Sequence, residues 1–254
     1  MLTVAEKPLA VGKPLTGGKG MSAEKFVDQL QKDCLDHPAM KHSYLKKFKN
    51  REVNKAQVKV FAEQYYCFSR HFARYLAALV AITPDEAARA PLIKNLGEEY
   101  GARQEENQEM DAERTHPAIF RGFLRSVGID TSPEALAAIK PLPETKLFVD
   151  KYLNIRFLNY IEAFGGMGPG TEYIVPQMYT LIREGCRGAG LSEDDVLFFS
   201  AHIELDVEHA EGIKESLIPF AQTADHQEIL RFGAMDFLDA RTVLWDGLER
   251  ASGL

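Results

Sequence analysis

One amphipathic segment near the end of the chain constrains the fold more than any other feature. The segment FFSAHIELDVEHAEGIKESLIPF occupies residues 198–220. Large apolar residues recur in it at helical spacing: Phe199, Ile213, Leu217 and Phe220. A stripe with this period predicts one amphipathic helix, beginning at Ser192 and ending near the last of these residues. A helix of this kind must pack its apolar face against other elements.

Three ionisable residues interrupt the stripe. His202, Asp206 and His209 fill the gap between Phe199 and Ile213 at steps of three and four residues. At about 100° per residue, the three side chains lie within about 60° of one helix face. Burial of such groups is costly unless a partner compensates them. Two imidazoles and one carboxylate suit iron, manganese or zinc, so the segment predicts a metal site.

The remaining sequence repeats the helical pattern. We predict helices over residues 22–36, 37–49, 54–83, 84–101, 116–127, 133–139, 143–164, 171–187, 192–220 and 224–250. No segment combines alternation of period two with enrichment in β-branched residues. The sequence therefore predicts an all-α bundle of about seven to nine helices. Residues 1–21 are interpreted as a mobile N-terminal tail and residues 22–254 as a single domain.

Composition excludes several classes of partner. The chain has 254 residues with 45% hydrophobic residues, which is enough for a sizeable core. A net charge of −7 argues against general binding to nucleic acid or to an anionic membrane. No apolar run approaches the roughly 18 residues of a membrane span, and no secretory signal begins the chain. Cys34, Cys67 and Cys186 are isolated, which favours a reducing cytoplasm over a disulfide framework.

Further metal ligands would have to come from other helices. Glu172 begins a mostly apolar helix, where it is either a partner of the helix dipole or a ligand that points inward. The segment NLGEEYG at 95–101 ends a helix with two carboxylates, which are either solvated or ligands. His116 precedes a proline at a helix start, where a cap residue and a ligand are both plausible. Taken singly, each of these residues fits a structural role as well as that of a metal ligand.

The order of four segments adds a resemblance. NLxxExG, HPxxFxxFL, ExxxP and HxxxDxxH resemble the heme-oxygenase-like diiron oxidase family, which shares its fold with thiaminase II and pyrroloquinoline-quinone synthase. The resemblance runs from about residue 37 to the C-terminus, and HxxxDxxH is its most specific part. It implies a heme-oxygenase-like helical bundle that forms a homodimer. It also implies six metal ligands: Glu99, His116, Glu172, His202, Asp206 and His209.

Of the six assignments, that of the first glutamate, Glu99, has the most competing residues. Glu99 fits the family pattern better than Glu98, because it lies four residues after Asn95 and two before Gly101. The interval from Glu99 to His116 is longer than the family pattern implies. It holds an acidic insert at 102–115, whose Glu106 and Glu109 compete as ligands.

The resemblance also implies a chemistry. Its members are iron- and dioxygen-dependent oxidoreductases with two iron ions, manganese being the alternative metal. The expected substrate is a small amino-acid- or fatty-acid-like carboxylate, oxidised by N-oxygenation or oxidative carbon–carbon cleavage. Side chains for its binding are expected at Tyr44, Tyr65, Arg156 and Arg183, with Tyr66, Arg70 and His71 as further lining residues. Arginine is chosen because guanidinium binds carboxylate through two parallel hydrogen bonds.

Three other functions stay open. A self-sacrificing para-aminobenzoate synthase, such as the chlamydial type, would consume a tyrosine at the position of Tyr44. Against it, Ile182 and Phe61 replace a lysine and a tyrosine of that subgroup. A metal-free, thiaminase-like hydrolase would need Cys186 as its nucleophile; a quinone-cofactor-synthase-like relative is the other metal-free form. A non-enzymatic iron-binding interaction protein is the third.

Overall fold

The computed structural model describes residues 21–102, 112–113, 115–203 and 215–254, and in these ranges it contains helices and no strand. The prediction of an all-α fold is therefore confirmed. The elements are α1 (Ala23–Asp36), η1 (Pro38–Lys41), α2 (Ser43–Lys49), α3 (Lys55–Ser69), α4 (Phe72–Ile82), α5 (Glu86–Glu99), α6 (His116–Ser126), α7 (Pro133–Ala138), α8 (Pro143–Leu153), η2 (Ile155–Phe157), α9 (Tyr160–Met167), η3 (Glu172–Ile174), α10 (Val175–Gly188), η4 (Ile218–Ala221) and α12 (Ala224–Ser252).

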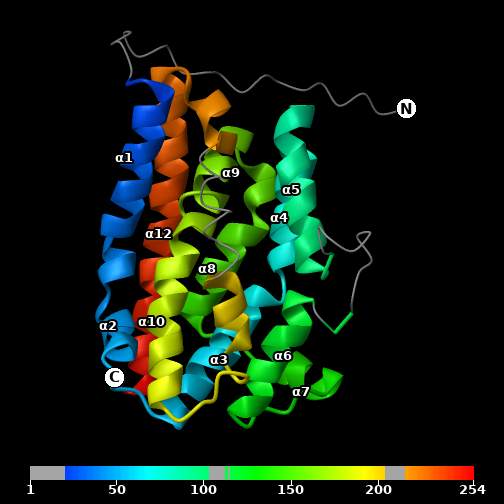
Figure 1. Cartoon of the computed structure of the whole chain (residues 1–254), viewed down its shortest axis with the longest axis vertical. Helices are drawn as coiled ribbons and strands as arrows, with labels where there is room; N and C mark the ends of the chain where they lie inside the picture. Colours follow the sequence, from blue (N-terminus) through cyan, green and yellow to red (C-terminus); the bar gives the residue numbers. More distant parts are fainter. Residues whose placement is uncertain (1–20, 103–111, 114, 204–214) are drawn as a thin grey trace.

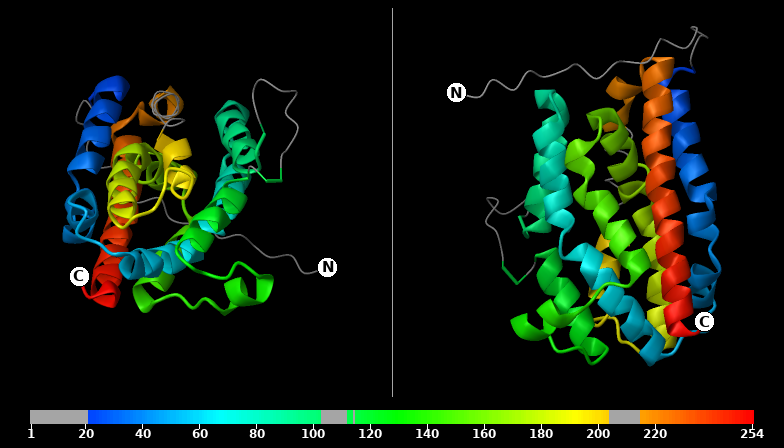
Figure 2. Two further views of the ribbon diagram at one scale, coloured as in Figure 1. Left: turned by 60° about the horizontal axis from the view of Figure 1, so that its bottom comes forward. Right: turned by 180° about the vertical axis from the view of Figure 1, so that it is seen from behind.

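Helix α12 is the longest of the described helices. It is 29 residues long and packs against α9, α8, α3, α1 and α2. Figures 1 and 2 show it running almost the full height of the molecule beside α1. Its buried face includes Phe237, Leu238, Leu244, Trp245 and Leu248. Burial of a large apolar side chain contributes about 1.5–3 kcal/mol, so this helix anchors the core.

Two glycines bring α9 into direct contact with α12. A Cβ atom added to Gly165 would lie 2.1 Å from the carbonyl oxygen of Leu230. A Cβ atom added to Gly233 would lie 2.0 Å from the carbonyl oxygen of Glu162. Only residues without a Cβ permit this approach of the two backbones. The tight seam fixes the loop after α9, which leads directly into η3 and α10.

The predicted helix over 54–83 is wrong in one respect, because it divides into α3 and α4. Its start is confirmed by a capping box between Asn54 and Gln57. At the division, the backbone N–H of His71 donates to the carbonyl of Phe68, which tightens the last turn. The hydroxyl of Tyr75 also donates to that carbonyl at 3.3 Å. The regular ladder stops there and begins again at Phe72.

The predicted helix over 143–164 is also wrong, since it divides into α8, η2 and α9. The side chain of Asn159 accepts a hydrogen bond from the backbone N–H of Ile161 at 2.8 Å and so begins α9. With these divisions, the described residues contain eleven labelled α-helices besides the helical segment 197–203, against about seven to nine predicted. Within the predicted helix from Ser192, residues 193–196 form turns, residues 197–203 and 215–217 are helical, and η4 follows; residues 204–214 lie outside the described part.

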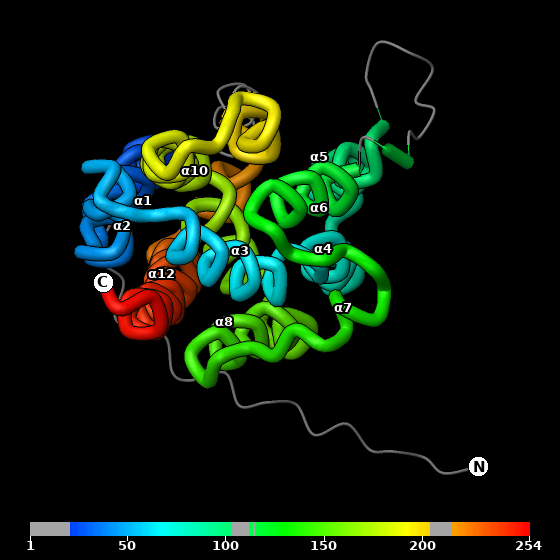
Figure 3. Tube along the Cα trace, turned by 90° about the horizontal axis from the view of Figure 1, so that it is seen from below, coloured from blue at the N-terminus to red at the C-terminus, as the bar shows by residue number. Residues whose placement is uncertain are grey.

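Helix α5 lies at the side of the bundle and packs mainly against α4 (Figure 3). Glu99 is its only buried residue, whereas Ile93 is exposed. The one α5 side chain that is buried is therefore a carboxylate, while Ala88, Leu92 and Leu96 pack half-buried against the core. Among the described helices, none is both long enough and apolar enough to span a bilayer.

Candidate metal centre

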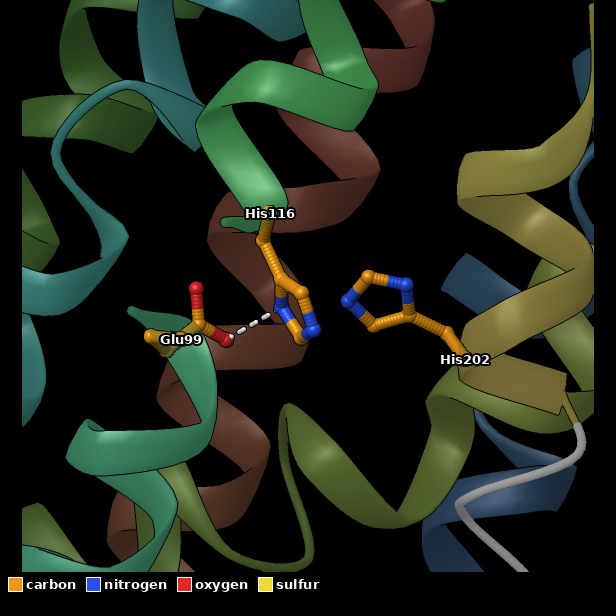
Figure 4. A group of neighbouring side chains, drawn as sticks. All are labelled: Glu99, His116 and His202. Atoms are coloured by element: carbon orange, nitrogen blue, oxygen red, sulfur yellow. Dashed lines mark hydrogen bonds and ion pairs between the residues drawn. The ribbon is translucent and has the colours of Figure 1, made fainter. Parts of the chain in front are cut away.

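Three side chains from three helical segments converge at one point. Glu99 ends α5, His116 begins α6, and His202 belongs to the helical segment 197–203. Figure 4 shows their functional groups directed toward one another. One nitrogen or oxygen atom of each residue lies within 4.8 Å of such an atom in the other two. A group of this size, two nitrogens and one oxygen, fits a single metal ion.

Local structure fixes the first pair of these residues. Thr115 caps α6 by accepting a hydrogen bond from the N–H of Ala118, and Pro117 preorganises the first turn. His116 Nδ1 then lies 2.8 Å from Glu99 Oε1. Two ligand atoms at about 2.1 Å from one ion and at right angles lie about 3.0 Å apart. The pair therefore already has the spacing of two neighbouring metal ligands.

The orientation of His202 also suits a ligand. Its Nδ1 lies 2.6 Å from the carbonyl oxygen of Phe198, to which it donates as Nδ1–H. That tautomer carries the lone pair on Nε2, the atom that then binds a metal. The His202 ring lies 4.3 Å from the His116 ring and 4.4 Å from the Phe198 ring, measured between centroids. The imidazole is thus held by a backbone acceptor and by two rings.

These residues line one cavity of about 600 Å³, including its open mouth. Glu172, the first residue of η3, lines the same cavity and is half-buried. Much of the wall is aromatic, from side chains that include Tyr65, Phe120, Tyr179 and Phe198. The described part of the site therefore combines carboxylate and imidazole groups suited to bind a metal with a largely aromatic cavity wall.

The structure places the six predicted ligands as follows. Glu99, His116, Glu172 and His202 line the same cavity, whereas Asp206 and His209 lie outside the described residues. The fallback residue Glu98 has its carboxylate 3.8 Å from Lys94 on the outer side of α5. The geometry therefore favours Glu99 as the inward carboxylate. The competitors Glu106 and Glu109 also lie outside the described residues.

The four predicted substrate-binding residues do not come together. Tyr65 lines the cavity, where its hydroxyl lies 2.9 Å from that of Tyr179. Tyr44 is fully buried elsewhere, stacked on Trp245 at 5.7 Å. Arg156 is exposed and lies over the exposed ring of Phe157. Arg183 is half-buried and contacts Ser200 at 3.4 Å.

Arg156 and Arg183 are therefore not brought to the cavity; neither they nor Tyr44 are among its lining residues. The further predicted residues Tyr66 and Arg70 do line it. The sequence analysis missed Arg241, which is fully buried on α12 and lines the cavity. A signal for it exists, because Arg241 interrupts the apolar stripe of α12 as His202 interrupts that of its own segment.

Burial decides the protonation of several nearby groups. It raises the pKa of Tyr65 and of Tyr152 above the usual value, so both hydroxyls stay protonated. Burial likewise raises the pKa of the Cys186 thiol, which argues against a thiolate nucleophile at that position. Cys34 behaves in the same way, with its pKa raised by burial to about 12. Both thiols are therefore held in the protonated form.

With this geometry established, comparison with known proteins becomes informative. The family model of iron-containing redox enzymes matches residues 59–242, which is most of the chain. The chain belongs to this family of iron-containing redox enzymes. It is therefore an oxidoreductase, and iron is the metal that the donor set of Glu99, His116 and His202 is expected to hold.

Curated relatives cover almost the whole chain. It is 24% identical over 232 residues to the 4-chloro-allylglycine synthase of Streptantibioticus cattleyicolor, covering 91% of this chain and 85% of the relative. It is 27% identical over 235 residues to the 4-aminobenzoate synthase of Chlamydia trachomatis, covering 85% of this chain and 94% of that protein. Relatives of similar identity to this chain are thus named for different products.

Solved structures agree on the fold. A CADD-like protein from Nostoc punctiforme aligns over 92% of this chain and 99% of its own, with a TM-score of 0.73 and 17% identity. A TenA homologue from Pseudomonas syringae pv. tomato aligns over 89% of this chain and 93% of its own, with a TM-score of 0.70 and 13% identity. A domain with a heme oxygenase-like fold from Shewanella denitrificans aligns over 91% of this chain and 92% of its own, with a TM-score of 0.67 and 18% identity, which confirms the predicted heme-oxygenase-like bundle.

Proposed function

We propose that this protein is a dioxygen-dependent diiron oxidase that oxidises a small carboxylate. The observation that carries the proposal is the convergence of Glu99, His116 and His202 within 4.8 Å. Two imidazoles and a carboxylate with open positions are a donor set typical of non-heme iron enzymes that use dioxygen. Membership of the iron-containing redox enzyme family supports the choice of metal.

The second iron rests on three further residues. Glu172 lines the same cavity as the triad, and Asp206 and His209 follow His202 at helical spacing in the sequence. Three carboxylates and three neutral imidazoles around two divalent cations leave one net positive charge. A site with this charge and an apolar wall admits a neutral diatomic molecule and attracts an anionic substrate.

The residues of the chain perform binding and positioning. Bound iron would supply the electrons for dioxygen reduction. The carbonyl of Phe198 holds the proton on Nδ1 of His202 and so keeps that imidazole oriented. The rings of Phe120 and Phe198, 4.8 Å apart, form part of the wall that excludes water. The hydroxyls of Tyr65 and Tyr179 are paired at 2.9 Å, and burial raises the pKa of Tyr65, which keeps its hydroxyl protonated inside the cavity.

The relatives support an amino-acid-like substrate. One is named as a synthase of a chlorinated allylglycine, an amino acid, and another as a synthase of 4-aminobenzoate. For this chain we propose N-oxygenation or oxidative carbon–carbon cleavage of an amino-acid- or fatty-acid-like carboxylate.

Rapid mixing tests this function. The protein is loaded anaerobically with Fe(II) and mixed with oxygenated buffer, alone and with a panel of amino acids and fatty acids. We expect a transient visible absorption band whose formation or decay is accelerated by one member of the panel, with consumption of that compound. No oxygen-dependent band, together with no consumption of any panel member, would contradict the proposal.

A self-sacrificing 4-aminobenzoate synthase is the second candidate, favoured by the name of the Chlamydia trachomatis relative. Tyr44 is the tyrosine expected to be consumed, yet it is buried against Trp245 and does not line the cavity. The positions of the subgroup's lysine and second tyrosine hold the buried apolar residues Ile182 and Phe61. Mass analysis of the protein and of its Tyr44 peptide after one turnover separates the candidates, since only self-sacrifice removes mass from that peptide.

A further inference from the structure

Arg241 carries a buried positive charge that the described protein does not neutralise. Its side chain is fully buried, and Nη2 donates to the hydroxyl of Tyr152 at 3.1 Å. Nη1 lies 3.5 Å from the sulfur of Met178, a weak acceptor. Nε has no hydrogen-bond partner. No described carboxylate lies within ion-pair distance of this guanidinium.

The neighbours of Arg241 are neutral. The guanidinium lies over the ring of Phe148, 5.0 Å from its centroid. It also interacts with the hydroxyl of Tyr65. Burial keeps Tyr65 and Tyr152 protonated, so neither supplies a negative charge. A buried cation without a counter-ion costs several kcal/mol, and arginine cannot release its proton to avoid this cost.

Two short paths connect Arg241 to the proposed iron site. On one side, Tyr152 lies 2.7 Å from the hydroxyl of Thr171, the residue that precedes Glu172. On the other side, Tyr65 contacts Tyr179, whose ring centroid is 5.4 Å from that of His202. Arg241 lines the same cavity as Glu172 and His202. An anion bound by Arg241 is therefore held beside the metal ligands.

We propose that Arg241 is the anchor for the carboxylate group of the substrate. The planar guanidinium forms two parallel hydrogen bonds with a carboxylate, and the unused Nε supplies one of the donors. The aromatic walls then hold the apolar body of the ligand. This assignment rests on the proposed oxidase function and names the group by which the substrate is recognised. Amino acids and fatty acids share that group.

Binding measurements on the iron-loaded full-length protein test the anchor without turnover. Under anaerobic conditions, calorimetry compares L-norleucine with L-norleucinamide and decanoate with decanamide. Each pair differs in the carboxylate alone, and the two pairs separate an amino acid from a fatty acid. We expect at least one acid to bind and its amide to bind roughly 100-fold more weakly, as loss of a charged hydrogen-bonded pair implies.

Arg241→Met is the decisive variant, and Arg231→Met is its matched control on the same helix. Arg231 is paired with Asp33 at the surface and does not line the cavity. We expect Arg241→Met to weaken binding of the acid roughly 100-fold and to leave binding of the amide unchanged. Arg231→Met should retain the wild-type preference for the acid. Arg241→Lys should recover part of that preference, because it restores the charge without the planar fork.

A melting curve separates an anchor from a purely structural arginine. Removal of an uncompensated buried charge in favour of an apolar side chain is neutral or stabilising. We therefore expect the ligand-free Arg241→Met protein to melt no lower than the wild type. A wild-type protein that binds neither acid, or one that binds acid and amide equally, would overturn the proposal. So would an Arg241→Met variant that is strongly destabilised and yet keeps its preference for the acid.

Iron content, measured on the same samples, separates this proposal from the proposed function. If the wild type binds iron but shows no preference for a carboxylate, the anchor alone is wrong. If the wild type binds no iron, the oxidase function is wrong, whatever the result for the acids. Arg241→Met should bind as much iron as the wild type, because Arg241 is not one of the six predicted ligands.

Discussion

Helices α5 and α12 both reach the cavity, but they are held in the fold in different ways. Helix α12 buries a long apolar face and contacts five other α-helices, and two glycines close its seam with α9. Helix α5 packs mainly against α4, and its single buried residue is Glu99. The first helix is held by a long buried apolar face, the second by a few half-buried apolar side chains and one buried ionisable group.

This difference separates the two sources of stability in the protein. The position of α12 does not depend on any bound group, and it presents Arg241 from a rigid frame. The position of α5 depends on modest apolar packing and on what Glu99 binds, which in the described protein is His116 at 2.8 Å. A metal ion bound by both residues would add free energy to α5 and very little to α12.

The largest expected effect comes from alanine at the glycine of the seam. Gly233→Ala places a Cβ atom 2.0 Å from a backbone oxygen, so the free energy of unfolding should fall by about 3 kcal/mol. Gly97→Ala in α5 is the matched control, because its nearest neighbour would be Ala102 at 3.6 Å. That variant should be neutral or more stable by up to about 1 kcal/mol. Urea denaturation measures the free energy of unfolding of both variants. Equal losses in the two would contradict the difference between α12 and α5.

The next effect concerns iron affinity. Glu99→Gln removes the inward carboxylate and should weaken binding of Fe(II) by about 100-fold or more. Glu98→Gln, one residue away and facing Lys94 at 3.8 Å, should leave it within about twofold. Anaerobic titration with a competing chelator measures both affinities. If Glu98→Gln loses iron and Glu99→Gln keeps it, the assignment of the first glutamate is wrong.

A smaller effect is expected on the exchange of backbone amides. Binding of Fe(II) should slow hydrogen exchange in α5 by about tenfold and leave exchange in α12 unchanged. Of these two helices, only α5 carries a predicted metal ligand. Mass spectrometry of peptic peptides compares the iron-loaded and chelator-treated protein. His202→Ala, which removes a ligand from another segment, should abolish the slowing. Equal slowing in both helices would show that iron acts on the whole fold and not on α5.

The smallest effect is a change of the free energy of unfolding with pH. Its source is His71, which lies at the junction of α3 and α4, and α4 is the helix against which α5 packs. Burial, followed by the neighbouring Arg70 and Arg74, lowers the pKa of His71 below its usual value. The unfolded chain then binds the proton more tightly, so stability is complete above about pH 6.5 and falls with pH below it. His71→Gln should reduce this slope slightly in melting experiments at pH 5 to 7.5. An unchanged slope would remove His71 as its source.

The helices whose signals lie in short motifs could be predicted from the sequence. The capping box of Asn54 and Gln57 and the glycine after α6, Gly128 with a φ of 77°, are where the sequence places them. The breaks inside two predicted helices were harder. Asn159 is a visible cap signal in hindsight, but no glycine or proline marks the break at His71. At that break the hydroxyl of Tyr75 donates to the carbonyl of Phe68, a contact that local propensity does not encode.

The candidate site was predictable where polar residues interrupt an apolar stripe. That signal identified His202, and the inward position of Glu99 agrees with the choice made from the NLxxExG pattern. Arg241 carries the same signal but was not among the predicted residues, whereas Arg156 and Arg183, which were predicted, do not line the cavity. Whether an arginine is buried beside a site depends on tertiary packing, and the stripe of α12 could have shown it.

The iron content of the wild-type protein tests the central claim most directly. The protein is dialysed anaerobically against excess Fe(II), freed of unbound metal and analysed for iron per chain. If Glu99, His116 and His202 form part of a diiron centre with Glu172, Asp206 and His209, two irons per chain are expected. A protein that retains less than one iron per chain after this loading would contradict the account.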